Sequence, residues 1–227
     1  MTRSLEPELM DSPDVVGPVL EKFHRDLRRV HALLGSFPTI ERFLRADELP
    51  VRRVLDIGCG GGALLDYLRR RLGVEVIGVD RKPGHTADVP IVAADATTDR
   101  LPEADVAVSS LVAHHLTPEQ NIALIRNVSR SCRRFVILDL IRHPMPLVLF
   151  SVFICPLIGK EAAVDGRQSI RRAFTPEEFA GLVRQALQGT VGTFEIDVSR
   201  FLSRQIVDIR YLTDGGSLPT EGRFCKA

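Results

Sequence analysis

Five short runs of branched and apolar residues, with helical spacing between several of them, constrain the fold more than any other feature of this chain. Runs of this kind are typical of strands buried on both faces of a parallel sheet, whose connections are right-handed crossovers. The pattern predicts an α/β fold with a doubly wound, mostly parallel sheet and a ligand crevice beyond the carboxyl ends of its strands. The runs occupy 53–57, 74–79, 90–93, 105–109 and 135–139.

Two later runs, at 193–198 and 205–211, alternate apolar and polar residues and predict a terminal antiparallel pair. They bring the expected sheet to seven strands. Leucines at helical spacing predict a helix over 62–72. Two further helices are predicted after Thr-Pro-Glu-Gln at 117–120 and Thr-Pro-Glu-Glu at 175–178, because each supplies an N-cap, a proline for the first turn and a capping-box side chain.

The first 50 residues have a different character, with apolar positions at helical spacing such as Val16, Leu20 and Leu27. We expect an N-terminal helical cap over 1–50 and a sheet domain over 51–227. The segment 1–14 is acidic and polar and lacks both the basic start and the apolar centre of a secretory signal. We therefore expect a cytoplasmic protein.

Composition argues against several classes of partner. The 227 residues hold 30 Lys and Arg against 29 Asp and Glu, a formal net charge of +1, which gives no global attraction to nucleic acid. Two tyrosines and no tryptophan leave little for base stacking. The cysteines Cys59, Cys132, Cys155 and Cys225 are scattered without a CxxC pair. We predict neither a disulfide framework nor a metal site.

The uncharged segment 144–159 is the most apolar part of the chain. It is shorter than the roughly 20 residues of a membrane-spanning helix, and Pro146 and Pro156 interrupt it. It lies in an insertion at about 142–172, after the fifth run, where it would form an apolar wall for a lipophilic acceptor. A core helix, a dimer interface and a transient membrane-surface contact are the alternatives, and either a monomer or a homodimer is compatible with them.

A glycine loop follows the first run in the sequence VLDIGCGGG at 54–62. Glycines at a strand-to-helix turn permit positive φ and let the backbone approach a ligand. Asp80 ends the second run, 22 residues after Gly58, where a carboxylate accepts the hydroxyls of a ribose, and Asp95 follows the third run. A dinucleotide also fits this layout, but Asp56 suits the anionic pyrophosphate poorly and favours a ligand with a cationic end.

These residues resemble the class I S-adenosylmethionine-dependent methyltransferases: VLDIGCGGG, then VIGVD, then AAD. The resemblance implies a Rossmann-like methyltransferase sheet and S-adenosylmethionine as cofactor. It implies that the glycine loop passes under the methionine part, that Asp80 binds the ribose, that Arg81, Asp95 and Ala96 lie beside the base, and that Ser109 and Ser110 face the sulfonium and the acceptor. The implied cofactor-binding set is Asp56, Gly58, Cys59, Gly60, Asp80, Arg81, Asp95, Ala96, Ser109 and Ser110.

The acceptor is predicted to be a small, lipophilic molecule with a phenolic or polyketide hydroxyl. The adjacent His114 and His115 follow the fourth run, at the expected mouth of the site, and one of them would serve as the general base. The segment 169–176 resembles the one before the last helix of quinone-biosynthesis methyltransferases. Arg171 and Arg172 in it are either surface residues or ligands of an acidic or phenolate acceptor.

Three other functions remain open from the sequence. Carbon methylation of a quinone-like ring is the nearest alternative. A catalytically silent partner protein would bind the cofactor only, but the damaged glycine loop expected of such a protein is absent here. A nicotinamide-binding protein is the third. The Ser109-Ser110-Leu111-Val112 sequence lacks the Asn/Asp-Pro-Pro-aromatic pattern typical of enzymes that methylate nucleobase nitrogens, which argues against a nucleic-acid substrate.

Overall fold

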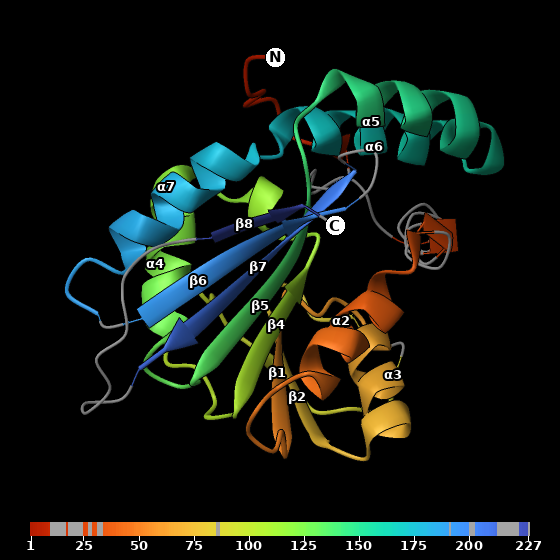
Figure 1. Ribbon diagram of the computed structural model, residues 1–227. Coiled ribbons are helices and arrows are strands. Elements are labelled where there is room, and N and C mark those ends of the chain that lie inside the picture. Colours follow the sequence, from red (N-terminus) through yellow and green to blue (C-terminus); the bar gives the residue numbers. More distant parts are fainter. Residues whose placement is uncertain are drawn as a thin grey trace.

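The computed structural model describes residues 1–9, 17, 25–26, 29–30, 34–84, 87–190, 192–199 and 203–212, and the backbone of 223–226. Its strands form one sheet in the order β3-β2-β1-β4-β5-β7-β6-β8 (Figure 1). The strands are β1 Arg53–Ile57, β2 Glu75–Asp80, β3 Ile91–Ala93, β4 Val106–Ser110, β5 Arg134–Leu140, β6 Gly192–Val198, β7 Arg204–Tyr211 and β8 Arg223–Lys226.

The predicted sheet is confirmed. Strands β1 to β5 pair in parallel, whereas β7 pairs antiparallel with both β5 and β6. The eighth strand, β8, pairs in parallel with β6 and was not predicted, because four residues are too few to give a periodic pattern. From β1 the chain moves outward to β3 and then returns to β4, so the order reverses between β1 and β4. This reversal places the ligand crevice at the carboxyl ends of those two strands.

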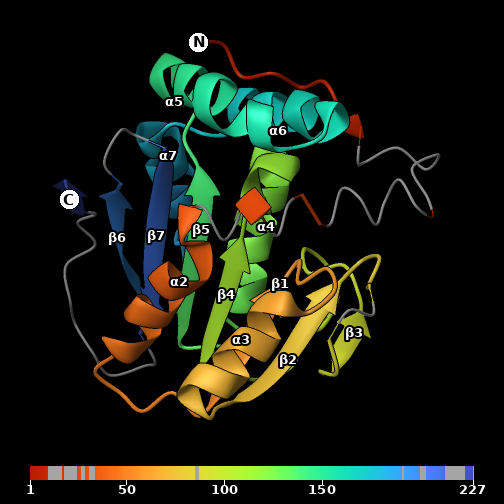
Figure 2. The same ribbon diagram turned by 90° about the vertical axis from the view of Figure 1, so that its right-hand side faces the viewer.

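Helices cover both faces of the sheet (Figure 2). The predicted capping boxes at Thr117 and Thr175 are confirmed: each hydroxyl accepts a hydrogen bond from the backbone N–H three residues later, at 3.2 Å. Buried apolar side chains form one core on each face of the sheet. The helices are α2 Ser36–Arg45 and α3 Ala63–Leu72 on one face, and α4 Pro118–Val128 and α7 Pro176–Ala186 on the other.

Of the predicted helical cap over 1–50, residues 10–16, 18–24, 27–28 and 31–33 lie outside the described residues. Its described helix, α2, buries Ile40 and Leu44 against α3 and β5, so this part belongs to the core of the sheet domain. The division of the chain at residue 50 stays a prediction. Residues 1–9, which we name the N-terminal strap, have an extended course along the helix α6 Lys160–Arg172.

The insertion after β5 forms a helical hairpin beyond the carboxyl edge of the sheet (Figure 2). Its first arm is the apolar segment, and its second arm is α6 Lys160–Arg172. The interpretation as a core helix is wrong, since Val148, Val152, Phe153 and Leu157 of the first arm are more than half exposed. Within the described ranges, no helix is long and apolar enough to cross a bilayer. The first arm comprises α5 Pro144–Leu149, the π-helical η3 Phe150–Ile154 and the 3-10 turn η4 Cys155–Leu157.

Candidate active site

The glycine loop joins β1 to α3 in a left-handed backbone. Gly58, Gly60 and Gly62 have φ values of 69°, 53° and 81°, which only glycine adopts without strain. A Cβ on Gly58 would lie 2.5 Å from the Val112 side chain, and one on Gly62 would lie 2.5 Å from Val89. At Gly60 a Cβ would meet nothing within 4 Å. The loop is therefore packed at both ends and open at its centre.

Asp80 lies beside this open centre. One of its carboxylate oxygens accepts a hydrogen bond from the Gly60 N–H at 2.8 Å, and the other accepts one from the Lys82 N–H at 2.8 Å. The Gly84 N–H donates to the Gly60 carbonyl at 3.0 Å. The predicted ribose-binding acid and the glycine loop are thus brought together and held in fixed positions by main-chain groups.

Asp56 is buried one residue before the end of β1, with 2% of its surface exposed. Burial raises the pKa of its carboxyl well above the ordinary value, and the charge of Asp80 raises it further. A cationic ligand would reverse this effect by stabilising the carboxylate. Burial also raises the pKa of the Cys59 thiol, whose sulfur packs against Gly78. Cys59 therefore offers a ligand its backbone and not a reactive thiolate.

The loop after β3 is held by short-range hydrogen bonds. Asp95 accepts from the hydroxyl and the N–H of Thr97, at 2.6 and 2.9 Å, and these two bonds lower the pKa of its carboxyl. Arg81 lies 4.0 Å from Asp95. The Asn127 side chain of α4 donates to the Ala96 carbonyl at 2.9 Å. The residues predicted to lie beside the nucleobase are therefore neighbours, although Arg81 follows β2 while Asp95 and Ala96 follow β3.

Two serines at the end of β4 carry unsatisfied hydroxyls. The Oγ atoms of Ser109 and Ser110 are buried and have no hydrogen-bond partner among the described residues. A buried hydroxyl without a partner costs free energy, which a bound polar ligand recovers. The chain then turns at Leu111, which adopts φ 59° and donates its N–H to the Leu138 carbonyl at 2.9 Å. Together with the open glycine loop and Asp80, these hydroxyls fit a nucleoside cofactor that extends from β2 to β4.

The turn after Leu111 leads into η2 Ala113–His115, which carries the predicted histidine pair. His114 is 2% exposed and its Nδ1–H donates to Asp139 Oδ1 at 2.6 Å. The other oxygen of Asp139 accepts the His114 backbone N–H at 2.9 Å. A carboxylate that holds one ring nitrogen in this way fixes the tautomer and makes the other nitrogen, Nε2, a hydrogen-bond acceptor. The pair has the geometry of a general base and its orienting acid.

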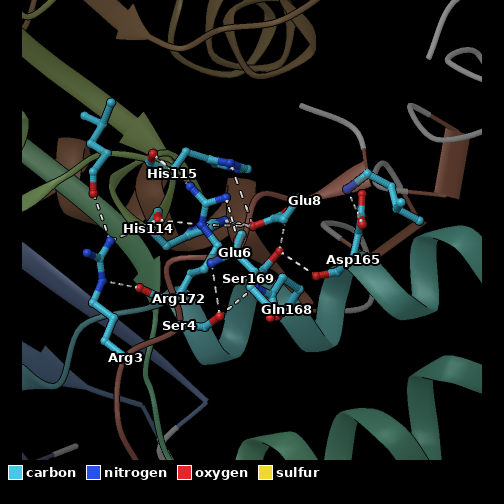
Figure 3. Close-up of polar contacts among 12 residues, drawn as sticks. Arg3, Ser4, Glu6, Glu8, His114, His115, Asp165, Gln168, Ser169 and Arg172 are labelled. Atoms are coloured by element: carbon cyan, nitrogen blue, oxygen red, sulfur yellow. Dashed lines mark hydrogen bonds and ion pairs between the residues drawn. The ribbon is translucent and has the colours of Figure 1, made fainter. Parts of the chain in front are cut away.

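The N-terminal strap closes over the histidines (Figure 3). Glu8 is 4% exposed and accepts a hydrogen bond from the Ser169 hydroxyl of α6 at 2.7 Å. Its second oxygen lies 3.8 Å from both His114 Nε2 and His115 Nδ1 and 3.9 Å from Arg172 Nε. The buried carboxylate therefore stands directly in front of the ring nitrogen that would act as the base.

Arg172 is not the surface residue that the sequence favoured. Only 11% of its side chain is exposed, and its guanidinium donates to the carbonyls of His114 and His115 at 3.3 and 3.0 Å. Arg171 is exposed, as expected. Asp139 was not among the predicted site residues, although it ends a predicted strand just as Asp80 follows one. Glu8 and Ser169 were not predicted either, because their contact joins residues 161 positions apart and leaves no local signal in the sequence.

Comparison with known proteins agrees with this geometry. The family model described as "Methyltransferase domain" matches residues 23–140. This match covers half of the chain and includes the glycine loop, Asp80, Asp95, the histidine pair and Asp139. The chain belongs to this family, and it is a class I S-adenosylmethionine-dependent methyltransferase by sequence and fold.

Several relatives and structures are similar to the chain. The ubiquinone biosynthesis O-methyltransferase of Hahella chejuensis is 27% identical over 61% of this chain and 63% of its own length. The trans-aconitate 2-methyltransferase of Mycobacterium tuberculosis is 40% identical over 33% of this chain and 31% of its own. The chain thus spans less than two thirds of each of these relatives.

Solved structures share the fold at low identity. A plantazolicin methyltransferase bound to a substrate analogue and S-adenosylhomocysteine (SAH) superposes with a TM-score of 0.69 at 16% identity, covering 86% of this chain and 91% of that one. Human N-acetylserotonin methyltransferase gives 0.57 at 17% identity, covering 88% and 60%. These likenesses concern the fold alone.

Proposed function

We propose that the protein transfers the methyl group of S-adenosylmethionine to a hydroxyl of a small acceptor with a lipophilic portion. The observation that carries this proposal is the His114–Asp139 pair beside the buried, unsatisfied hydroxyls of Ser109 and Ser110. A base of this kind is needed by a hydroxyl acceptor, whose pKa resembles that of tyrosine when it is a phenol. The ubiquinone-pathway relative, an O-methyltransferase by name, supports an oxygen nucleophile.

The cofactor, when bound, supplies an electrophilic methyl group on a sulfonium. The chain's own residues do the rest. With the cofactor bound, the Gly58 and Gly60 backbone would pass along its methionine part, the Asp80 carboxylate would hold its ribose, and Asp56 would supply negative charge toward its cationic end. His114 Nε2 removes the proton from the acceptor hydroxyl, while Asp139 stabilises the imidazolium that forms. Most of the rate enhancement then comes from alignment of the oxygen with the methyl group.

The exposed apolar residues of the insertion support a lipophilic acceptor. Val148, Val152, Phe153 and Leu157 form a continuous apolar stripe on the first arm, 57–63% exposed. We propose that this stripe contacts a membrane surface transiently, where lipophilic acceptors partition, and that the chain works in the cytoplasm as a monomer or homodimer without nucleic acid. The predicted role of this segment as an apolar wall over the acceptor stays a prediction.

Carbon methylation of a quinone-like ring is the second candidate, because a deprotonated phenol ring also reacts at carbon and would use the same His114 base. The experiment is a screen of alkylated phenols and quinone precursors with S-adenosylmethionine labelled in the methyl group. Nuclear magnetic resonance of the product then distinguishes O-methyl from C-methyl. A short hydrophilic phenol turned over as well as its long-chain homologue would contradict the lipophilic acceptor.

Calorimetric titration with SAH and with NAD tests the cofactor itself. We expect binding of SAH and none of NAD. A protein that binds SAH but methylates nothing in the screen would instead be the silent partner named above.

A further inference from the structure

Glu8 is the single buried residue among the described positions 1–9 (Figure 3). The Ser169 hydroxyl donates to its carboxylate at 2.7 Å, and Arg172 Nε lies 3.9 Å from it. His114 Nε2 and His115 Nδ1 lie at 3.8 Å, where an imidazole favours an anion when it is protonated. These groups come from η2 and α6, which belong to the sheet domain. A receptor for one carboxylate is therefore built into the domain, and the strap fills it.

The charges around this receptor favour an anion over a metal ion. The ligand atoms of Glu8, His114 and His115 lie within 4.8 Å of one another, a spacing that would also suit a metal. However, the Arg172 guanidinium lies 3.9 Å from the same carboxylate oxygen. Arg172 belongs to α6, so it stays in place when the strap and Glu8 are withdrawn. A guanidinium at this distance repels a cation and attracts an anion.

The receptor lies where the proposed acceptor must react. His114 Nε2 is the nitrogen proposed to remove the acceptor's proton, and Glu8 faces it. While the strap is docked, no acceptor oxygen reaches that nitrogen. Glu8 must therefore leave before turnover, and its place is then taken by an acceptor oxygen.

We propose that the receptor formed by His114, His115, Ser169 and Arg172 is the acceptor's anion site, and that Glu8 is a built-in competitor for it. The acceptor is then a molecule with an ionised oxygen, of a carboxylate or an acidic phenolate, next to the hydroxyl that loses its proton to His114 and is methylated. This inference rests on the proposed function and adds the charge class of its substrate. Among the described strap residues Glu8 alone is buried, and the others are joined to the domain by hydrogen bonds, such as Ser4 N–H to the Arg171 carbonyl at 3.0 Å and Gln168 to Ser4 and Glu6 at 2.8 Å. A segment held in this way can open locally while the core of the domain stays folded.

The test compares anionic and neutral probes by calorimetry on the full chain with SAH present. The probes are 4-butylbenzoate, 4-nitrophenolate and the neutral 4-butylbenzamide. The variant is Glu8→Gln, which removes the competing charge, and the matched control is Glu6→Gln, the same change at an exposed position of the strap. We expect Glu8→Gln to bind one or both anions at least about 10-fold more tightly than the wild type, since the variant removes a carboxylate that occupies the site and repels a second anion. The affinity for the neutral amide should change less than about twofold, because the amide carries no charge. Glu6→Gln should bind all three probes as the wild type does.

Which anion gains affinity identifies the source of the charged oxygen, carboxylate or phenolate. Equal gains for amide and anions, or weaker anion binding in Glu8→Gln, would overturn the proposal. So would tight binding of zinc chloride to the wild type that Glu8→Gln abolishes, because the cluster would then be a metal site. If the wild type did not bind SAH, that result would count against the proposed function and not against this inference alone.

A measurement on the unaltered protein removes dependence on the variant's folding. Hydrogen exchange at the strap amides, such as those of Ser4 and Leu9, should accelerate when 4-butylbenzoate is added and not when 4-butylbenzamide is added. Exchange that the benzoate leaves unchanged would show that the strap is a fixed wall and would overturn the proposal.

Discussion

The two halves of the candidate site differ in the chemical groups that form them. The cofactor half, at the ends of β1 and β2, is made mainly of backbone groups and short side chains: the left-handed glycine loop and an aspartate fixed by two main-chain N–H groups. The acceptor half, beyond β4 and β5, is made of long side chains from segments far apart in the chain, such as Glu8, His114 and Arg172. Backbone geometry is rigid, whereas a contact between distant segments can open.

This difference assigns different tasks to the halves. A site of main-chain groups binds one ligand in one pose, as a cofactor requires. A site closed by a strap accepts its ligand only after a local opening, which suits discrimination among acceptors. If the two halves are independent, a change in one should leave binding in the other intact.

The largest effect is expected from the base. His114→Ala should lower kcat by about 100-fold or more, in the range that general bases contribute. SAH affinity should stay within about twofold, because a cofactor held by main-chain groups does not depend on the imidazole. Turnover with the acceptor found in the screen and calorimetry with SAH measure the two quantities. A parallel loss of both would mean that the halves are coupled through the turn at Leu111.

The corresponding change in the cofactor half is Asp80→Ala. Removal of the carboxylate should weaken SAH binding by about 10- to 100-fold, the loss of charge-assisted hydrogen bonds worth about 1.5–3 kcal/mol. Glu75→Ala, at the exposed amino end of the same strand, is the control. Calorimetry with 4-butylbenzoate, performed without SAH, should give equal affinity in Asp80→Ala and the wild type. Unequal affinity would contradict the independence of the two halves.

A smaller effect concerns Asp56 and pH. Because burial raises the pKa of its carboxyl, the group gains a proton at a higher pH than an ordinary aspartate. As pH rises through that pKa, the carboxylate forms and attracts the sulfonium of S-adenosylmethionine, but not the neutral sulfur of SAH. The ratio of their affinities should rise from pH 5 to pH 8, by up to about 10-fold for one charge pair. Asp56→Asn should make the ratio independent of pH, and a slope that survives in this variant would assign the effect to another group.

The smallest effect is expected at the apolar stripe, which neither half of the site uses directly. Val152→Ser combined with Phe153→Ser should reduce sedimentation with phosphatidylglycerol vesicles by about 3- to 10-fold, because each exposed apolar side chain adds to membrane binding. Val92→Ser, 40% exposed on β3, is the control. SAH affinity should be the same in all three proteins. If the double variant sedimented with vesicles as much as the wild type does, the proposal that the stripe contacts a membrane would be wrong.

The cofactor half could be read from the sequence because each of its parts is a local pattern. Gly58, Asp80 and Asp95 each follow a predicted strand, and parallel strands bring their carboxyl ends to one edge. The helix starts at Thr117 and Thr175 could be predicted for the same reason, since a capping box spans only four residues. The acceptor half could not be read in this way. Glu8 contacts Ser169 across 161 residues, and Arg172 is buried by contacts with both η2 and the strap.

Leu111 sets a limit on how far heat resistance of this protein can be improved without loss of turnover. A branched residue in a left-handed conformation costs about 1–2 kcal/mol relative to glycine, and the turn it forms delivers His114 to Asp139. Selection for thermostable variants would favour Gly or Asn at this position, because either relieves that cost. Glycine would also give the backbone of this turn more freedom. At this position we therefore expect a gain in thermal stability through glycine to lower the catalytic rate.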